Sequence, residues 1–240
     1  MLESFALTDQ GCVRGNNEDY CLAKPELGLY VLADGMGGAK AGEHASHLAV
    51  STVTEVVERA GRRDSQVLLQ AVEEANRRVL NAAQKDPELE GMGTTLLAAL
   101  QVGEEVSIAS VGDSRAYLLD ESGFRAITED QTWVHDVARP LGLDEEAMRH
   151  HPMRHVLTMA IGAGSPLSIN YYAVRMEPSS LLLMCSDGLH GVVPPSTIEE
   201  ILRNTSHNGS LETQCKMLIE AARKAGGPDN ITAILVRPAP

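Results

Sequence analysis

Apolar residues recur at helical spacing in three segments of the chain. Residues 41–60 and 65–83 each carry one apolar stripe whose members lie three or four positions apart, which is typical of a helix with one buried face. A third stripe runs from Leu211 to Ala222 and stops before the breaker GGPDN. We therefore predict three amphipathic helices.

Short apolar runs bounded by turn residues predict strands between and around these helices. The runs are FALTD, YCLAK, LYVLAD, TTLLAALQV, VSIASVGD, RAYLLD, FRAIT, INYYAVRM, LLLMCSD and ITAILV. They cluster before and after helix pairs instead of alternating with single helices, which favours antiparallel sheets covered by helices. The predicted fold class is α+β.

Residues 129–166 fit neither pattern. They hold the only Trp and a cluster of His150, His151 and His155, with helical fragments but no clear strand. We interpret the segment as a surface excursion, either a functional lid or a solvated, variable loop. Metal binding by the histidines is disfavoured because Pro152 breaks the helical geometry between His151 and His155.

Composition limits the partners and the location. The chain has 240 residues, 43% of them hydrophobic, and no low-complexity linker, so we expect a single domain over 1–240. Its net charge of −13 argues against nucleic acid or an anionic membrane as the main partner. The N-terminus lacks a signal-peptide pattern, and the uncharged stretch 156–174 is too rich in Gly, Ser and Pro to span a bilayer. We expect a cytoplasmic monomer.

The cysteines do not form a site by spacing. Cys12, Cys21, Cys185 and Cys215 contain no C-x-x-C pair and are too sparse for a disulfide framework. We interpret them as reduced thiols that fill apolar space.

Carboxylates recur where predicted strands meet glycine-bearing turns. Asp34, Asp113 and Asp187 each follow a strand, and Asp229 precedes one. An acidic pair, Glu18 and Asp19, stands immediately before another strand. Taken singly, an Asp-Gly pair is a turn signal, but the ordered set is hard to obtain from turn chemistry alone.

Converging carboxylates need a cation. If these strand ends meet, repulsion and desolvation would raise the pKa values of the acids and destabilise the fold. Oxygen ligands suit Mg²⁺ or Mn²⁺, and Gly35 would let its carbonyl approach the same ion. Zinc is disfavoured because no His or Cys cluster has ligand spacing. The glycines around Asp34 match neither a P-loop nor a dinucleotide fingerprint nor an EF-hand.

These residues resemble the PPM (type 2C) family of metal-dependent Ser/Thr protein phosphatases, in its compact bacterial form. The resemblance spans essentially the whole chain, through RGNNEDY, VLADGMGG, GMGTT, VGDSRAY, LLLMCSDGL and GGPDNIT in family order. It implies a four-layer α/β/β/α sandwich of two antiparallel sheets flanked by helix pairs, with a flap insertion at approximately 129–166.

The resemblance also implies a role for each site residue. Asp34 would bridge two Mn²⁺ or Mg²⁺ ions, and the Gly35 carbonyl would contact one of them. Asp187 and Asp229 would hold the first ion, and Glu18 would help to hold the second. Asp113 matches the position linked to a third, weaker ion, with help from Asp187.

Three further residues complete the implied site. Asp19 and Asn230 would support the ligands from a second layer. Arg14 matches the phosphate-binding arginine, whose guanidinium can fork onto two phosphate oxygens.

By resemblance, the ions activate a bridging water for in-line hydrolysis of phosphoserine or phosphothreonine without a phosphoenzyme. The substrates would be phosphorylated Ser/Thr proteins, including a cognate Ser/Thr kinase that the enzyme opposes.

The chain departs from the family pattern at two positions. Ala39 and Lys40 stand where many relatives have a His after the glycines, so the proton donor for the leaving group is open: His44 one turn later, or a metal-bound water. Gln131 stands where relatives often have His. Two alternatives to an active protein phosphatase therefore remain, a pseudophosphatase that serves as a binding module and a two-metal enzyme acting on small phosphate esters.

Overall fold

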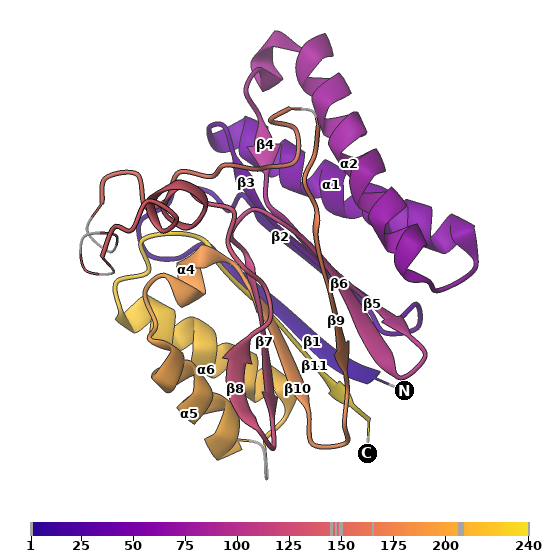
Figure 1. The fold of residues 1–240 in the computed structure, drawn as a ribbon, viewed down its shortest axis with the longest axis vertical. Helices are drawn as coiled ribbons and strands as arrows, with labels where there is room; N and C mark the ends of the chain where they lie inside the picture. The colour runs from indigo at the N-terminus through magenta and orange to yellow at the C-terminus, as the bar shows by residue number, and fades with distance from the viewer. Residues whose placement is uncertain are drawn as a thin grey trace.

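The protein is built from two antiparallel sheets packed face to face between two layers of helices, as the computed structural model shows (Figure 1). This arrangement confirms the predicted α/β/β/α sandwich. The structure describes residues 2–144, 146, 148, 151–164, 166–205 and 209–239.

The first sheet joins the two ends of the chain. Its strand order in the described residues is β1-β11-β10-β7-β8. The strands are β1 (Leu2–Asp9), β11 (Ile231–Pro238), β10 (Leu181–Cys185), β7 (Arg115–Asp120) and β8 (Gly123–Ala126).

The second sheet has the order β2-β3-β5-β6-β9 over the same described residues, and the short strand β4 pairs with β3. The strands are β2 (Asp19–Lys24), β3 (Leu29–Met36), β4 (Gly93–Thr94), β5 (Leu96–Val102), β6 (Glu105–Val111) and β9 (Asn170–Arg175).

Helix pairs cover the outer faces of both sheets. α1 and α2 pack on the second sheet, and α5 and α6 pack on the first (Figure 1). Their bounds are α1 (Ala39–Ala60), α2 (Ser65–Lys85), α5 (Pro195–Thr205) and α6 (Leu211–Lys224). Shorter turns of helix are η1 (Pro87–Leu89), η2 (Val134–Ala138) and α4 (Asp187–His190).

Strand β3 shows why the central strands read as unbroken apolar runs. Tyr30 and Leu32 face the core between the sheets, whereas Val31 and Ala33 face the layer of α1 and α2. All four side chains are fully buried. Successive side chains of a strand point to opposite faces, so a strand covered on both faces is apolar throughout.

The predicted helices and strands are all present, but α5 was missed. Ile198 and Leu202 are fully buried against the first sheet, and Pro195 begins the helix. The apolar stripe is short and lies close to Pro194 and Pro195, and in the structure it packs against the first sheet and α6. A Pro at the first helical position is favourable, since that N–H has no helical partner.

The segment 129–166 leaves the sandwich between β8 and β9 and lies beside α4 (Figure 1). Its two arms meet where Thr132 bridges to Leu157 and the Trp133 N–H donates to the Val156 carbonyl at 2.8 Å. The Trp133 ring stacks on the His151 ring, and the two ring centroids lie 4.5 Å apart. His150 lies outside the described residues.

Chain topology brings the acidic strand ends together. β3 ends just past Asp34, α4 begins at Asp187 after β10, and β11 begins just after Asp229. These ends lie away from the two chain termini (Figure 1). No helix among the described residues has the length and apolar character needed to cross a bilayer.

Candidate active site

A cavity of about 770 Å³ opens where these strand ends meet. It is lined by most of the residues that the sequence predicts for the site: Arg14, Glu18, Asp34, Gly35, Asp113, Asp187, Asp229 and Asn230. Asp19 does not line the cavity, because it is buried beneath it. Segments from both sheets therefore contribute to one site.

Asp34 is held at the floor of this cavity by its backbone. Its N–H donates to the Thr95 hydroxyl at 3.0 Å, and its carbonyl accepts from the Thr94 hydroxyl at 2.8 Å. Burial, followed by the charges of Asp19 and Asp187, raises the pKa of the Asp34 carboxyl well above its ordinary value. The fold thus concentrates negative charge at a poorly solvated point.

Asp19 lies directly across the β2–β3 ladder from Asp34. One carboxylate oxygen accepts hydrogen bonds from Ser186 at 2.8 Å and Thr232 at 2.6 Å. The other, Oδ1, is buried and has no hydrogen-bond partner among the described residues. Burial raises the pKa of Asp19 to about 7, although the two hydroxyl donors oppose the shift.

Asn230 fixes the loop that carries Glu18. Its Oδ1 accepts from the Glu18 N–H at 2.8 Å, and its Nδ2 donates to the carbonyls of Gln10 and Asn16 at 3.0 and 2.8 Å. This side chain therefore joins the turn before β11 to the turn before β2.

Glycines let this loop approach β3. A Cβ on Gly35 would overlap the Gly42 carbonyl, and a Cβ on Gly42 would overlap the Glu18 carboxylate. Gly37 and Gly38 have φ values of 120° and 92°, which side chains rarely adopt. The glycines around Asp34 are thus required by close packing and by a left-handed turn.

Asp187 and Asp113 form the wall of the cavity. Burial and then the charge of Asp229 raise the pKa of Asp187, and a hydrogen bond between its carboxyl and that of Asp34 opposes the rise. Burial, followed by the charges of Asp187 and Asp130, raises the pKa of Asp113 to about 7. Asp187 therefore interacts electrostatically with both Asp34 and Asp113.

Arg14 reaches across the mouth of the cavity to Asp229. Its Nη2 donates to Asp229 Oδ2 at 2.6 Å, and this hydrogen bond raises the pKa of the guanidinium further. About half of the Arg14 side chain (52%) is exposed, so its remaining donors are free to meet a ligand entering from solvent.

The residues fit a centre for hard divalent ions. The clustered oxygens, the unpartnered Asp19 Oδ1 and the raised pKa values all indicate a site that a cation would stabilise. Within the described residues, no three His, Cys, Asp or Glu side chains close into a cage around one point. Mg²⁺ does not need such a cage, because it keeps several waters and uses one or two carboxylates.

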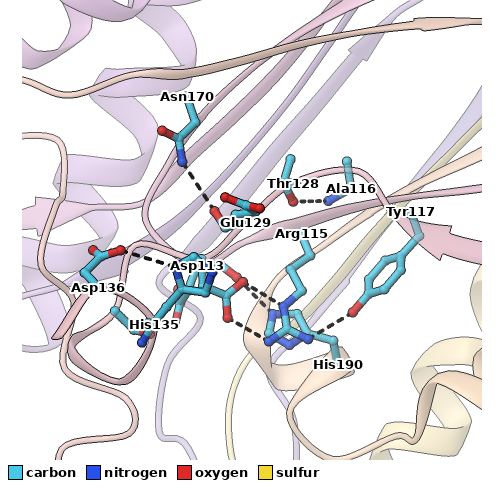
Figure 2. Close-up of polar contacts among 12 residues, drawn as sticks. Asp113, Arg115, Ala116, Tyr117, Thr128, Glu129, His135, Asp136, Asn170 and His190 are labelled. Atoms are coloured by element: carbon cyan, nitrogen blue, oxygen red, sulfur yellow. Dashed lines mark hydrogen bonds and ion pairs between the residues drawn. The ribbon is translucent and has the colours of Figure 1, made fainter. Parts of the chain in front are cut away.

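The turn that carries Asp113 is held by a second group of polar residues (Figure 2). His190 Nε2 donates to the Asp113 carbonyl at 3.0 Å, and burial, then the Arg115 charge, lowers the pKa of His190 to about 3. Arg115 forks onto Asp130 at 2.8 and 2.7 Å and contacts the Tyr117 hydroxyl at 3.1 Å. This neutral imidazole is a structural support that the sequence analysis missed.

Gln131, which departs from the pattern that the resemblance implies, also holds this turn. It is buried, and its Oε1 accepts from the Gly112 N–H at 2.9 Å while its Nε2 donates to the Ser168 carbonyl at 3.0 Å. The side chain therefore ties the turn before Asp113 to the segment that leads out of residues 129–166.

The histidines differ in their relation to the cavity. His44 is exposed on α1 and does not line it. His155 does line it, although the sequence predicts no role for this residue beyond a disfavoured metal ligand. Its position depends on how residues 129–166 fold back, which no local pattern reveals.

The thiols take no part in the cavity. All four cysteines are free, Cys185 and Cys215 are buried, and burial raises the pKa of each of these two to about 12. Such thiols are poor nucleophiles.

Comparison with known proteins identifies the class. The model of the protein phosphatase 2C family matches residues 14–225. A serine/threonine phosphatase stp of Listeria innocua is 36% identical over 95% of this chain and 93% of that protein.

Solved structures agree over the full length. A serine/threonine phosphatase structure from S. agalactiae covers 100% of both chains with a TM-score of 0.92 and 30% identity. The PstP catalytic domain in complex with two manganese ions covers 98% of this chain and 97% of that one, with a TM-score of 0.86 and 33% identity. The chain belongs to the protein phosphatase 2C family. It is a metal-dependent phosphoprotein phosphatase, as the resemblance predicts.

Proposed function

We propose that this protein hydrolyses phosphoserine and phosphothreonine in proteins, using two Mn²⁺ or Mg²⁺ ions in the cavity around Asp34. The observation that carries the proposal is the convergence of acidic strand ends from both sheets beside an exposed guanidinium. The two-manganese PstP structure, which is similar to this chain, supports the choice of ion.

The proposed ligands are the acids that line the cavity, together with the Gly35 carbonyl. Asp34, whose carboxyl is influenced by the charges of the other four aspartates around the cavity, would serve both ions. Asp187 and Asp229 would hold the first ion, and Glu18 with the Gly35 carbonyl would hold the second. When bound, the ions would lower the pKa of a water molecule and polarise the phosphate. Asp113, with Asp187, would hold a third and weaker ion.

The remaining residues have supporting roles in the proposal. Arg14 would bind two phosphate oxygens at the mouth, where its donors face solvent. Asp19 and Asn230 would hold the ligand-bearing segments in place through their hydrogen bonds to Thr232 and the Glu18 backbone. Since none of the four cysteines lines the cavity, and burial raises the pKa of the Cys185 and Cys215 thiols, the attacking group would be water and no phosphoenzyme would form.

We also propose that the physiological substrates include a Ser/Thr kinase and its targets, and that the enzyme acts as a cytoplasmic monomer. The relatives support the substrate class, since the Listeria and mycobacterial proteins carry the name serine/threonine phosphatase.

The test is hydrolysis of p-nitrophenyl phosphate and a phosphothreonine peptide with and without Mn²⁺. We expect both reactions to require the ion, to stop with chelator and to fall by orders of magnitude in Asp34→Asn. Mn²⁺ binding without hydrolysis of either substrate would identify a pseudophosphatase. Hydrolysis of metabolite phosphates but no phosphopeptide would identify a small-ester enzyme.

A further inference from the structure

The leaving oxygen of a phosphoserine or phosphothreonine needs a proton donor. Its alkoxide is a strong base, so expulsion without a proton is slow, whereas p-nitrophenolate is a stable anion and leaves unaided. A donor in this site must line the cavity and carry a transferable proton near neutral pH.

Few of the side chains that line the cavity meet this condition. Arg14 keeps its proton, because the Asp229 carboxylate raises its pKa further. The carboxylates are the proposed ion ligands, and an ion would keep them deprotonated. Thr95 Oγ1 accepts from the Asp34 N–H and lies 2.8 Å from the Ser114 hydroxyl. Among the described lining residues, only His155 carries an imidazole.

His155 is also in the right part of the cavity. Asp34 and Asp113, two of the acids that would hold the ions, are less exposed than His155, which lines the same cavity and is an exposed residue of the segment 129–166. A phosphopeptide approaches from solvent, so its leaving oxygen must lie on the solvent side of the phosphate, where His155 is exposed. The imidazole lies near enough to Asp187 that its cationic form opposes the rise in pKa of that carboxyl.

We propose that His155 is the proton donor to the leaving serine or threonine oxygen. This inference rests on the proposed phosphatase function. An oxygen from water forms the new P–O bond as the P–O bond to the side chain breaks. The leaving oxygen takes the proton from the imidazolium, which becomes neutral and is reprotonated by solvent. His44 is exposed and does not line the cavity, so it is not placed to donate this proton.

The experiment compares leaving groups in His155→Gln. We expect kcat for a phosphothreonine peptide to fall by about 10²- to 10⁴-fold, with KM changed only a few-fold. The loss on p-nitrophenyl phosphate should be at least about tenfold smaller, since its leaving group needs no proton. A solvent deuterium isotope effect on peptide hydrolysis should be present in the wild type and absent in the variant.

The matched control is His135→Gln, because His135 is in the same segment but does not line this cavity. In this control, the ratio of kcat for the phosphothreonine peptide to kcat for p-nitrophenyl phosphate should equal the wild-type ratio. Calorimetry should show unchanged Mn²⁺ binding by His155→Gln, and His155→Asn guards against a folding defect specific to one substitution.

Two results would overturn the proposal. Equal losses on both substrates would show that His155 acts on binding or folding, and an unchanged peptide rate would show that water supplies the proton. If the wild type hydrolyses neither substrate, the proposed function itself fails, which is a distinct outcome from either of these.

Discussion

The Arg14 guanidinium and the Asp229 carboxylate lie 2.6 Å apart across the mouth of the cavity. The pair joins the proposed phosphate ligand to a proposed ion ligand. Because Asp229 Oδ2 accepts from Arg14, a cation that binds this carboxylate competes with the guanidinium. Loading the ions should therefore free Arg14 donors for the substrate.

Replacing Arg14 should separate substrate binding from metal binding. In Arg14→Gln we expect kcat/KM for p-nitrophenyl phosphate to fall about 10- to 100-fold, the effect of losing a charge-assisted hydrogen bond of about 1.5–3 kcal/mol. Removing a competing cation should leave Mn²⁺ affinity unchanged or higher. Steady-state kinetics and calorimetric titration measure the two effects, and weaker Mn²⁺ binding would contradict the competition.

The metal-free protein should lose stability as the pH rises. The raised pKa values of Asp19 and Asp113, both about 7, mean that the folded state holds protons that the unfolded chain releases near pH 4. The unfolded state then binds fewer protons, so the free energy of unfolding falls between about pH 4 and about pH 7. Above about pH 7 the stability contributed by protonated Asp19 and Asp113 is fully lost.

Urea denaturation with chelator at about pH 5 and about pH 7.5 tests this direction. We expect the free energy of unfolding to be lower at the higher pH by about 2 kcal/mol or more, and Mn²⁺ to restore it there. In Asp34→Asn, which removes one carboxylate, the dependence should be weaker. Greater stability of the metal-free wild type at the higher pH would contradict the raised pKa values of Asp19 and Asp113.

Removing the Gln131 side chain should disturb the turn that carries Asp113. Gln131→Ala deletes one buried and one partly buried hydrogen bond, and we expect a loss of about 1–3 kcal/mol in unfolding free energy with reduced turnover per folded molecule. The control is Gln214→Ala, which deletes a buried bond to the Leu202 carbonyl between α6 and α5. It should be destabilised without losing turnover. Equal turnover in the two variants would assign Gln131 a purely structural role.

Replacing Asp113 should lower turnover without removing the two main ions. Asp113→Ala removes a wall carboxylate but leaves Asp34 and Asp187 in place, so we expect weaker turnover with the two main ions still bound. Calorimetric titration of Mn²⁺ into this variant decides the matter. Loss of all Mn²⁺ binding would place Asp113 in the main centre instead.

The sequence predicts those features of the site that a local pattern marks. Asp34 follows a strand whose residues are apolar because both faces are covered, and its glycines mark a turn that needs positive φ. That the acids would share one cavity follows from the resemblance, not from spacing, because no local rule states which strand ends meet.

Long-range contacts account for what was missed. α5 is short, and its apolar residues are buried against the first sheet and α6, which the local sequence does not reveal. Gln131 and His155 acquire their positions from the return path of residues 129–166, which has no periodicity to read. His190 follows an Asp-Gly pair in the sequence, and nothing local predicts that its ring donates a hydrogen bond to the Asp113 carbonyl.

The most direct test of the account is a calorimetric titration of Mn²⁺ into the wild type, Asp34→Asn and Asp120→Asn. Asp120 pairs with Arg125 in the β7–β8 hairpin and does not line the cavity, so it controls for loss of a carboxylate. We predict two tightly bound ions in the wild type, as in the PstP structure with two manganese ions, the same two in Asp120→Asn, and loss of both in Asp34→Asn. Undiminished binding by Asp34→Asn would contradict the claim that the carboxylates around Asp34 form the metal centre.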